Sequence, residues 1–417
     1  MSSEGKGGGC IGVGGVVVRE FDAERDCRGV EMVETRCEVG PSGKMSLFTD
    51  LMGDPICRVR HSPAFLMLVA ETGEEKEIVG LIRGCIKTVT CGKKMARNGK
   101  NSAENSGPVP IYTKLAYILG LRVSPSHRRM GIALKLVSRM EEWFRENGAQ
   151  YSYMATDKDN EASVKLFTER CGYSKFRTPA ILVQPVFAHS IRISHRAAIF
   201  KLPPSEAESL YRRRFATTEF FPRDIDAILA NPLSLGTFVA VPRAHFPAAA
   251  ASWPGVDCFL AAPPESWAVL SIWNSKEVFR LEVRGASRFR RTLSKTTRVA
   301  DRALPWLQIP SVPEVFRPFG LHFLYGLAGD GPGAVGLMRA LCGFAHNVAK
   351  EGGCGVVAAE VACCEPLKTG IPHWRRLSCA EDLWCMKRMG EDYSDGALGD
   401  WTKSPPGESV FVDPREF

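Results

Sequence analysis

The first half of the chain alternates short apolar runs with stretches whose apolar residues recur every three or four positions. Apolar runs between polar or glycine-rich turns predict strands, and the recurrence predicts amphipathic helices. The longest such helix ends at Gly148, a residue that commonly terminates helices. The predicted strands are 16–21, 65–71, 78–90, 112–123, 149–156 and 181–187, and the predicted helices are 22–39, 130–148 and 159–173.

This order of elements predicts an α/β fold in which helices cover both faces of a mixed sheet. Residues 91–109 are polar, basic and glycine-rich, so we expect a mobile surface loop there. The glycine-rich residues 1–13 are expected to be a flexible N-terminus, followed by a first domain over 14–195.

The second half repeats the pattern. Between Gly120 and Gly148 a strand ends, a loop follows and an amphipathic helix stops at glycine, over 28 positions, and Gly326 and Gly353 bracket the same pattern over 27. Such a spacing favours duplication, although any two strand–loop–helix units share this outline. We therefore predict a second domain over 196–417. Its strands are predicted at 197–202, 236–241, 266–273, 277–283 and 354–362, its helices at 204–215 and 222–232, and a strand–loop–helix unit at 319–353.

A basic loop joins a predicted strand to a predicted helix, with the sequence SPSHRRMGIALKLV over 124–137. The helix dipole disfavours positive charge at a helix start, so Arg128 and Arg129 need an explanation. Free amide groups at a helix start bind phosphate oxygens, and Gly131 lets the backbone come close to a ligand. Arginines are favourable there when the ligand is a di-anion. The spacing Arg128-x-x-Gly131-x-Ala133 therefore predicts a pyrophosphate site.

This stretch resembles the acetyl-coenzyme A (acetyl-CoA) signature of the GNAT superfamily of N-acetyltransferases, in which a strand leads through Arg/Gln-x-x-Gly-x-Gly/Ala into a helix. Residues 160–173, NEASVKLFTERCGY, resemble a second GNAT signature at the expected distance. The two motifs lie within 110–175, and the order of elements extends the resemblance to 14–190. The resemblance implies tandem GNAT-like domains, with acetyl-CoA as co-substrate of the first.

In GNAT proteins the pantetheine arm of the co-substrate lies between two parting strands. The resemblance implies that a backbone N–H at or near Leu121 polarises the thioester carbonyl and that amides from Arg129 to Ala133 hold the pyrophosphate. The residues that it assigns to co-substrate binding are Leu121, Arg122, Val123, Arg128, Arg129, Met130, Gly131, Ile132, Ala133, Asn160, Ser163 and Phe167.

Acetyl transfer requires a held thioester, an amine that loses its proton and a donor for the tetrahedral oxyanion. The sequence departs from the family pattern in two places. Phe167 stands where many relatives have a tyrosine acid, and phenylalanine donates no proton. Residues 111–123 contain no carboxylate, whereas many relatives have a glutamate base on this strand.

Four other residues are candidates for proton transfer. Tyr117 and Tyr173 are candidate acids, and both also fit amphipathic core positions. Asp157, Glu34 or a chain of water molecules are candidate bases, and the two carboxylates also fit as solvated surface groups.

The resemblance is closer still to the plant Hookless-type probable N-acetyltransferases and spans nearly the whole chain. It implies an intracellular plant protein of the nucleus or the cytoplasm, active in ethylene- and auxin-dependent differential growth, with histones or other proteins among the acceptors. The stretches that carry it include IRGCIKTVTCG, TTEFFPRDID, ESWAVLSIWN, KTTRVADRALPWL and GDWTKSPPGESVFVDPREF.

Composition narrows these expectations only slightly. Hydrophobic residues make up 45% of the 417 residues, and the net charge of +8 is mildly basic. The 14 cysteines form no CxxC pair, which favours reduced thiols and no metal site. The first residues resemble neither a secretory leader nor a myristoylation signal. No apolar run approaches the ~18 residues of a membrane span, so we expect no membrane partner.

The segment GLAGDGPGAVG of the second half has glycines but no matching arginine, and Asp330 repels phosphate. We therefore predict that the C-terminal copy is degenerate and binds no co-substrate. The basic segments 209–215 and 284–295 fit solvated helix faces better than a nucleic-acid surface. The main alternative to an enzyme is a non-catalytic regulator with a GNAT fold.

Overall fold

The computed structural model describes residues 15–37, 45–95, 109–245, 253–390 and 399–417. The N-terminus predicted to be flexible, 1–13, lies outside these residues, as does most of the predicted loop 91–109. The described part of that loop corrects the prediction, because strand β4 continues to Met95 and β5 begins at Val109.

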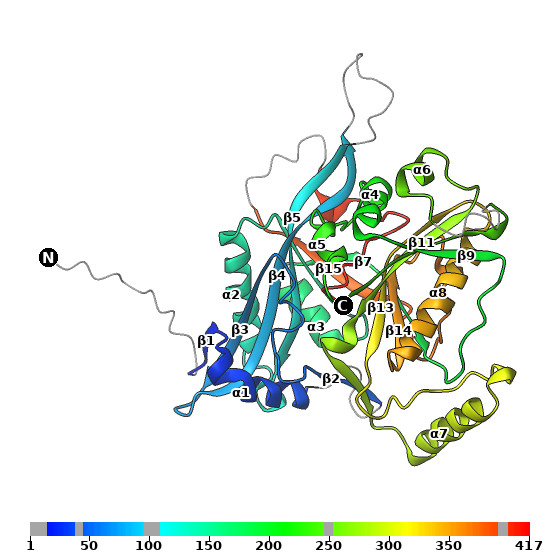
Figure 1. Ribbon diagram of the computed structural model, residues 1–417. Helices are drawn as coiled ribbons and strands as arrows, with labels where there is room; N and C mark the ends of the chain where they lie inside the picture. The colour runs from blue at the N-terminus through cyan, green and yellow to red at the C-terminus, as the bar shows by residue number, and fades with distance from the viewer. Residues whose placement is uncertain (1–14, 38–44, 96–108, 246–252, 391–398) are drawn as a thin grey trace.

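Two large sheets organise the chain (Figure 1). The seven-stranded sheet has the order β1 (Val17–Glu20), β3 (Ala64–Thr72), β4 (Glu77–Met95), β5 (Val109–Val123), β6 (Tyr151–Asp157), β15 (Asp382–Arg388) and β7 (Ser174–Arg177). The six-stranded sheet has the order β8 (Ala180–Pro185), β14 (Val356–Val361), β13 (Leu321–Asp330), β11 (Trp267–Asn274), β10 (Ser234–Pro242) and β9 (Ala197–Leu202). A small sheet pairs β12 (Arg280–Arg284) with β2 (Ser46–Asp50).

Helices cover these sheets or join their strands. The α-helices are α1 (Ala23–Arg36), α2 (Ile132–Glu146), α3 (Glu161–Lys165), α4 (Pro204–Phe215), α5 (Ile225–Leu229), α6 (Val256–Ala261), α7 (Arg288–Ala303) and α8 (Ala334–Glu351). A π-helical turn, η2 (Leu166–Arg170), continues α3. The 3₁₀ turns are η1 (Pro125–His127), η3 (Arg243–His245), η4 (Ser275–Glu277), η5 (Pro305–Leu307), η6 (Lys368–Gly370) and η8 (Trp401–Lys403).

Opposite faces of the seven-stranded sheet bury different helices. Val30 of α1 belongs to the same cluster as Val69 of β3, whereas Leu136 of α2 packs with the neighbouring Leu68. Because successive strand residues point to opposite faces, α1 and α2 lie on opposite sides. The prediction of a mixed sheet with helices on both faces is confirmed.

The two halves of the chain exchange a strand. Strand β8 precedes residue 195 but pairs with β14 of the six-stranded sheet, whereas β15 comes from the second half and lies between β6 and β7. The domain boundary between 195 and 196 stays a prediction, but neither sheet follows it. Each half needs a strand of the other to complete its sheet.

The two halves share a backbone plan at their central strands. Strand β5 pairs in parallel with β6 from Leu115 to Ile118, and β13 pairs in parallel with β14 from Leu321 to Leu324. Both strands then carry a bulge at a glycine five residues after the first pair, at Gly120 (φ +62°) and Gly326 (φ +60°). This correspondence confirms a tandem arrangement of two GNAT-like units.

One core cluster lies between the inner faces of both large sheets and receives the end of the chain. It contains Tyr117 and Tyr153 from the seven-stranded sheet and Phe323 from the six-stranded sheet. Phe411 packs against aromatic rings of α4 and β13, and the Phe417 ring stacks on Phe323 at 4.0 Å between centroids. The C-terminal segment 410–417 therefore joins the two halves from inside.

Candidate functional site

Strand β5 leaves β6 where the predicted pantetheine slot begins. Their last paired residues are Ile118 and Met154, although β5 continues for five residues and β6 for three. At Gly120 the left-handed backbone inserts an extra residue into β5, so that Leu81 pairs with Arg122 and Arg83 with Leu119. Residues 121–123 are partly exposed, and past Ile118 they have no paired residue in β6, so their backbone groups on that side can bond an extended ligand.

The loop after this strand leads to the start of α2. Arg129 (φ +65°) and Gly131 (φ +77°) adopt left-handed backbone angles, and Met130 between them is 55% exposed. Successive amides in such a turn form an anion-binding concavity, and the start of α2 adds its dipole. Among the described contacts, none occupies the amides of Met130 or Gly131. The side chain of Arg128 turns toward the slot, with Nε 3.5 Å from the Val123 carbonyl oxygen.

The loop thus gathers one group of predicted co-substrate residues at one end of the slot. These residues are Leu121, Arg122, Val123, Arg128, Arg129, Met130, Gly131, Ile132 and Ala133. Ile132 differs from the others because its side chain is buried in the core under α2. Their contacts with a ligand stay predictions.

The second motif forms the start of α3 and the turn that follows. The Asn160 side chain accepts a bond from the Ser163 amide at 3.3 Å and caps α3. Phe167 is buried and meets the Tyr173 ring edge-on at 5.2 Å. The motif therefore has a structural role here, and its predicted contacts with the pantetheine arm stay predictions.

The two candidate acids lie on opposite faces of the seven-stranded sheet. Tyr173 packs in the cluster under α2, and its hydroxyl lies 2.9 Å from Ser152 Oγ. Tyr117 belongs to the inner core and stacks on Tyr153 at 4.4 Å. Burial raises the pKa of both hydroxyls well above 10. The structure does not bring the two together, and either would hold its proton tightly.

The candidate base Glu34 lies among guanidinium groups. Its Oε1 accepts a bond of 2.8 Å from Arg83, and its Oε2 is 3.5 Å from Arg122. Burial raises the pKa of Glu34, but the two arginines overcome this effect and hold it below 4.5. A carboxylate with a low pKa is a weak proton acceptor. The other candidate, Asp157, is exposed and accepts a bond from the Asp159 amide.

Two buried carboxylates that sequence reasoning missed lie on strands of the two sheets. Glu360 of β14 and Asp382 of β15 are each 8% exposed, and Glu360 accepts a bond of 3.0 Å from Trp384 Nε1. Burial and the neighbouring Asp382 raise the pKa of Glu360 to about 8, and burial raises that of Asp382 to about 7. A raised pKa near neutral suits a group that accepts a proton.

The register of the sheet places this pair beside the slot. Asp382 pairs with Asp157, the last residue of β6. The offset of the β5–β6 pairs, continued past Ile118 with one residue added for the bulge at Gly120, sets Arg122 at the level of Asp157 across the slot. Asp382 and Trp384 therefore lie on the strand next to the slot wall, and Glu360 of the other sheet is bonded to Trp384. The only local sign of Glu360 in the sequence was a charged residue near the end of the apolar run VVAAEV.

A third buried group comes from the end of the chain. Glu416 accepts bonds from Tyr153 Oη at 2.6 Å and from Lys87 Nζ. Asp413 also lies near Lys87, at 3.4 Å, and Arg415 pairs with Asp413 and Asp224. This network fixes the C-terminal segment against the face of β5 that carries Tyr117.

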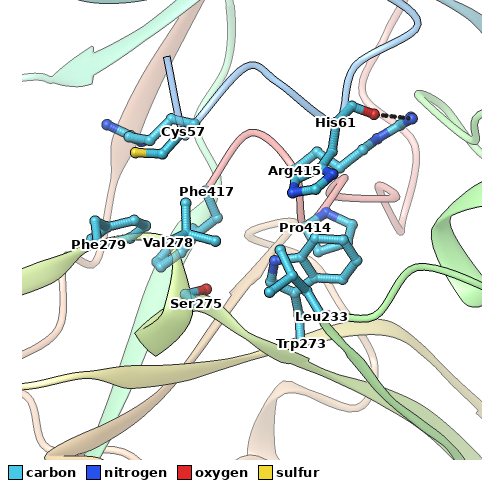
Figure 2. A pocket seen from close by; sticks show the side chains of 11 residues that line it. Cys57, His61, Leu233, Trp273, Ser275, Val278, Phe279, Pro414, Arg415 and Phe417 are labelled. Carbon is cyan, nitrogen blue, oxygen red and sulfur yellow. Dashed lines mark hydrogen bonds between the residues drawn. The ribbon is translucent and has the colours of Figure 1, made fainter. Parts of the chain in front are cut away.

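A small pocket opens beside this network, between the two halves (Figure 2). Trp273, Val278 and Phe279 form its apolar wall, and Cys57 faces them. Arg58 also lines the pocket, with its guanidinium carbon 5.4 Å from the centroid of the Phe279 ring. Figure 2 shows Arg415 donating to the carbonyl oxygen of His61, a bond of 3.2 Å. Arg58 Nη2 lies 3.4 Å from the Glu416 carbonyl oxygen, so the pocket adjoins the C-terminal segment.

In the second half, the region that corresponds to the slot and the anion site is buried or hydrogen-bonded within the chain. Leu327 and Ala328, which follow the bulge of β13, are buried. The amide of Gly333 at the start of α8 donates to Ser266 Oγ at 2.9 Å, and the amide of Gly331 donates to Asp330 at 2.8 Å. The predicted loss of phosphate binding thus has a second physical cause besides the charge of Asp330, because the chain itself occupies the amides.

Within the described residues, two further kinds of feature are absent. No group of three or more His, Cys, Asp or Glu side chains there gathers closely enough to hold a metal ion. No helix in the same part of the chain combines the length and the apolar character that crossing a bilayer requires.

Comparisons with known proteins agree with this geometry. Residues 31–173 match the acetyltransferase (GNAT) family. Over 96% of its length, the chain is 68% identical to the whole of the probable N-acetyltransferase HLS1 of Arabidopsis thaliana. It is 41% identical to the acetyl transferase GW6a of Oryza sativa subsp. japonica, over 96% of this chain and 97% of that protein.

Among solved structures, the Saccharomyces cerevisiae N-myristoyltransferase with bound myristoyl-CoA is similar with a TM-score of 0.52. The similarity covers 91% of this chain and 80% of that one at 10% identity, so it concerns the fold alone. With two spaced motifs and such identity over nearly the whole length, the chain belongs to the GNAT acetyltransferase family, among the Hookless-type probable N-acetyltransferases.

Proposed function

We propose that the protein transfers an acetyl group from acetyl-CoA to an amine acceptor, such as a lysine of a histone or of another protein. One observation carries the proposal: a strand that parts from its neighbour at Gly120 leads directly to the unoccupied amides before α2. An extended thioester with a charged diphosphate end matches this combination of open strand backbone and anion site.

The residues of the slot have distinct tasks in this proposal. Backbone groups of residues 121–123 bond the extended arm, and the N–H at or near Leu121 stabilises the oxyanion. Amides of Arg129, Met130 and Gly131 hold the diphosphate, while the side chains of Arg128 and Arg129 balance its charge. Acetyl-CoA is favoured over longer acyl thioesters by the family membership of the chain.

Glu360 is the proton acceptor that we favour. Its pKa of about 8 makes it a better base near neutral pH than Glu34, which two arginines hold ionised. Its bond from Trp384, which belongs to the same core cluster as the pocket residues Trp273 and Phe279, supports a role on this side of the sheet. The thiolate is a fair leaving group, so transfer does not require an acid at the position of Phe167.

Calorimetry with acetyl-CoA tests the binding step. The variant Arg128→Glu plus Gly131→Asp places two negative charges in the anion site, so binding should weaken by about a hundredfold or more. A matched control is Arg213→Glu plus Gly148→Asp. Arg213 is exposed on α4, and Gly148 (φ +70°), like Gly131, leaves its Cβ position without neighbours. Equal binding by both variants would contradict the proposal.

A screen of acetyl transfer to histone peptides, other peptides and small amines identifies the acceptor class. With an acceptor from this screen, Glu360→Gln should lower kcat by about 10²–10⁴-fold and leave the binding of acetyl-CoA unchanged. An unchanged kcat would remove Glu360 from the reaction while leaving the binding proposal standing.

A second candidate function is a non-catalytic regulator. Buried Phe167 favours it, because this position supplies no proton donor to a slot that is otherwise open. Acetylated product that is formed by the purified protein and lost in the Arg128→Glu plus Gly131→Asp variant would exclude it.

We also infer a nuclear site of action and a role in ethylene- and auxin-dependent growth. Both rest on the resemblance to the Hookless-type proteins. Microscopy of the tagged full-length chain in plant cells tests the first. Restoration of growth by the wild-type chain, but not by the slot variant, in plants lacking the protein tests the second.

A further inference from the structure

Helix α7 presents its apolar side to solvent and its polar side to the protein. Its buried residues are Ser294 and Asp301. By contrast, Phe289 is 75% exposed, Leu293 52% and Val299 64%. Surface helices of globular proteins normally show the opposite arrangement. In Figure 1 the helix lies at the edge of the molecule, away from both large sheets.

Specific bonds of the polar side fix this orientation. Asp301 accepts a bond of 2.8 Å from the Ala188 amide and lies 2.6 Å from His189 Nδ1. Arg298 donates to the Val186 carbonyl oxygen at 2.6 Å. Burial raises the pKa of Asp301, but bonds from Ser311 and His189 hold it below 3.8. Rotation of the helix to bury Phe289 would leave Asp301 without these partners, which is costly.

The apolar surface continues past the helix into η5. Trp306 is 62% exposed and Leu307 54%. Two threonines on the exposed side of α7 do not interrupt this surface strongly, because their hydroxyls bond carbonyl groups of the helix itself. These bonds run from Thr292 to the Arg288 carbonyl at 3.0 Å and from Thr296 to the Thr292 carbonyl at 3.1 Å.

The exposed charges beside this surface all have one sign. Arg288, Arg291, Lys295 and Arg302 are exposed along one side of α7, and Arg290 is exposed elsewhere on the helix. Asp301 is the one acidic residue between 285 and 310, and it is buried on the inner side. On a helical projection the four cations form a single edge that borders the stripe of Phe289, Leu293 and Val299.

We propose that α7 and η5 form a docking surface for an anionic lipid membrane. A helix with an apolar face of Phe, Leu and Trp and a border of Arg and Lys lies in a membrane interface, with its charges at the headgroups. The helix projects at the edge of the molecule, which suits a deformable lipid layer. Nucleic acid would use the cations but would gain nothing from the exposed Leu293 and Leu307. No apolar run long enough to span a bilayer is needed for such binding.

Flotation of the full-length chain with vesicles tests this inference independently of acetyl transfer. The protein should bind vesicles of phosphatidylcholine with 30% phosphatidylserine, and binding should fall steeply with salt. Phe289→Ser plus Leu293→Ser should weaken binding at least about tenfold, and so should Lys295→Glu plus Arg302→Glu. Both variants keep the anchors Asp301 and Arg298.

The matched control removes apolar groups elsewhere. Val17→Ser plus Val109→Ser changes two exposed valines far from α7 and should bind like the wild type. Absence of binding to the anionic vesicles, or equal binding to pure phosphatidylcholine, would overturn the proposal. If the Phe289→Ser plus Leu293→Ser variant binds vesicles normally but loses self-association in sedimentation, the surface contacts a protein instead.

Discussion

The two halves of this molecule share a bulged central strand but treat the following helix start differently. After Gly120 the strand edge is open and no described residue bonds the amides of Met130 and Gly131 before α2, whereas after Gly326 the strand is buried and Ser266 and Asp330 occupy the amides before α8. The comparison teaches that packing of the core is sufficient to keep this fold in both halves. Ligand binding additionally requires polar groups that the chain leaves unsatisfied.

The largest expected effect concerns the segment that joins the halves. Phe411→Ala removes a buried ring from between α4 and β13, so the free energy of unfolding should fall by about 3–5 kcal/mol. Chemical denaturation measures this change. Phe289→Ala is the matched control, because that ring is exposed, and it should change stability by less than about 0.5 kcal/mol. Equal losses in the two variants would show that the segment does not couple the halves.

The pH dependence of stability tests the carboxylates between the halves. A carboxyl group whose pKa is raised in the folded protein binds more protons in the folded state than in the unfolded state. Its contribution to the free energy of unfolding is therefore complete below its ordinary pKa and is lost as pH rises through the raised pKa. For Glu360 this loss of stability falls between pH 4.5 and about pH 8. The wild type should lose on the order of a few kcal/mol across it, and Glu360→Gln should flatten the decline.

Thermal unfolding at several pH values measures this effect. Glu351→Gln, a change at the exposed end of α8, serves as the control and should follow the wild-type curve. Parallel curves for the wild type and Glu360→Gln would contradict the raised pKa and weaken the case for Glu360 as a base.

The two bulge glycines should separate stability from ligand binding. A Cβ at Gly326 would lie 2.5 Å from the hydroxyl oxygen of buried Tyr211, whereas one at Gly120 would meet the end of the Arg83 side chain at 2.5 Å. We therefore expect Gly326→Ala to cost about 2–4 kcal/mol and Gly120→Ala about 1–2 kcal/mol. Binding of acetyl-CoA should weaken only in Gly120→Ala. The reverse order in either measurement would break the comparison.

The smallest expected effect concerns the residues that cap one helix in each half. Asn160 caps α3 and Ser287 caps α7, each by a side-chain oxygen that accepts an amide. Replacing either with alanine should cost about 0.5–2 kcal/mol. If Asn160 also borders the co-substrate, only Asn160→Ala should raise the Kd for acetyl-CoA. Titration calorimetry of both variants decides this.

The sequence predicted features that depend on neighbouring residues. Periodicity placed β5 and α2 within a few residues, and the spacing around Gly131 predicted the loop that the structure shows between them. The long-range glycine spacing predicted the tandem units. Each of these signals lies within a single strand–loop–helix unit, so no knowledge of distant contacts was needed.

Features that depend on distant residues escaped prediction. Strand β15 lies between β6 and β7 only because the two halves exchange strands, and no local pattern encodes that partner. Glu360 gains its raised pKa from burial against the other sheet. The basic segment 284–295 was expected to be a solvated helix face. Which side of α7 is buried depends on Ala188 and His189, about a hundred residues away along the chain.

The strand exchange also constrains how the chain is made. During synthesis β8 emerges about 170 residues before β14, and the gap beside β6 stays unfilled until β15 leaves the ribosome. A nascent first half therefore exposes unpaired strand edges, which can pair with other chains, for many seconds at ordinary translation rates. Folding of the whole chain therefore depends on shielding those edges until β15 has been made, and truncated products should aggregate instead of yielding a folded half.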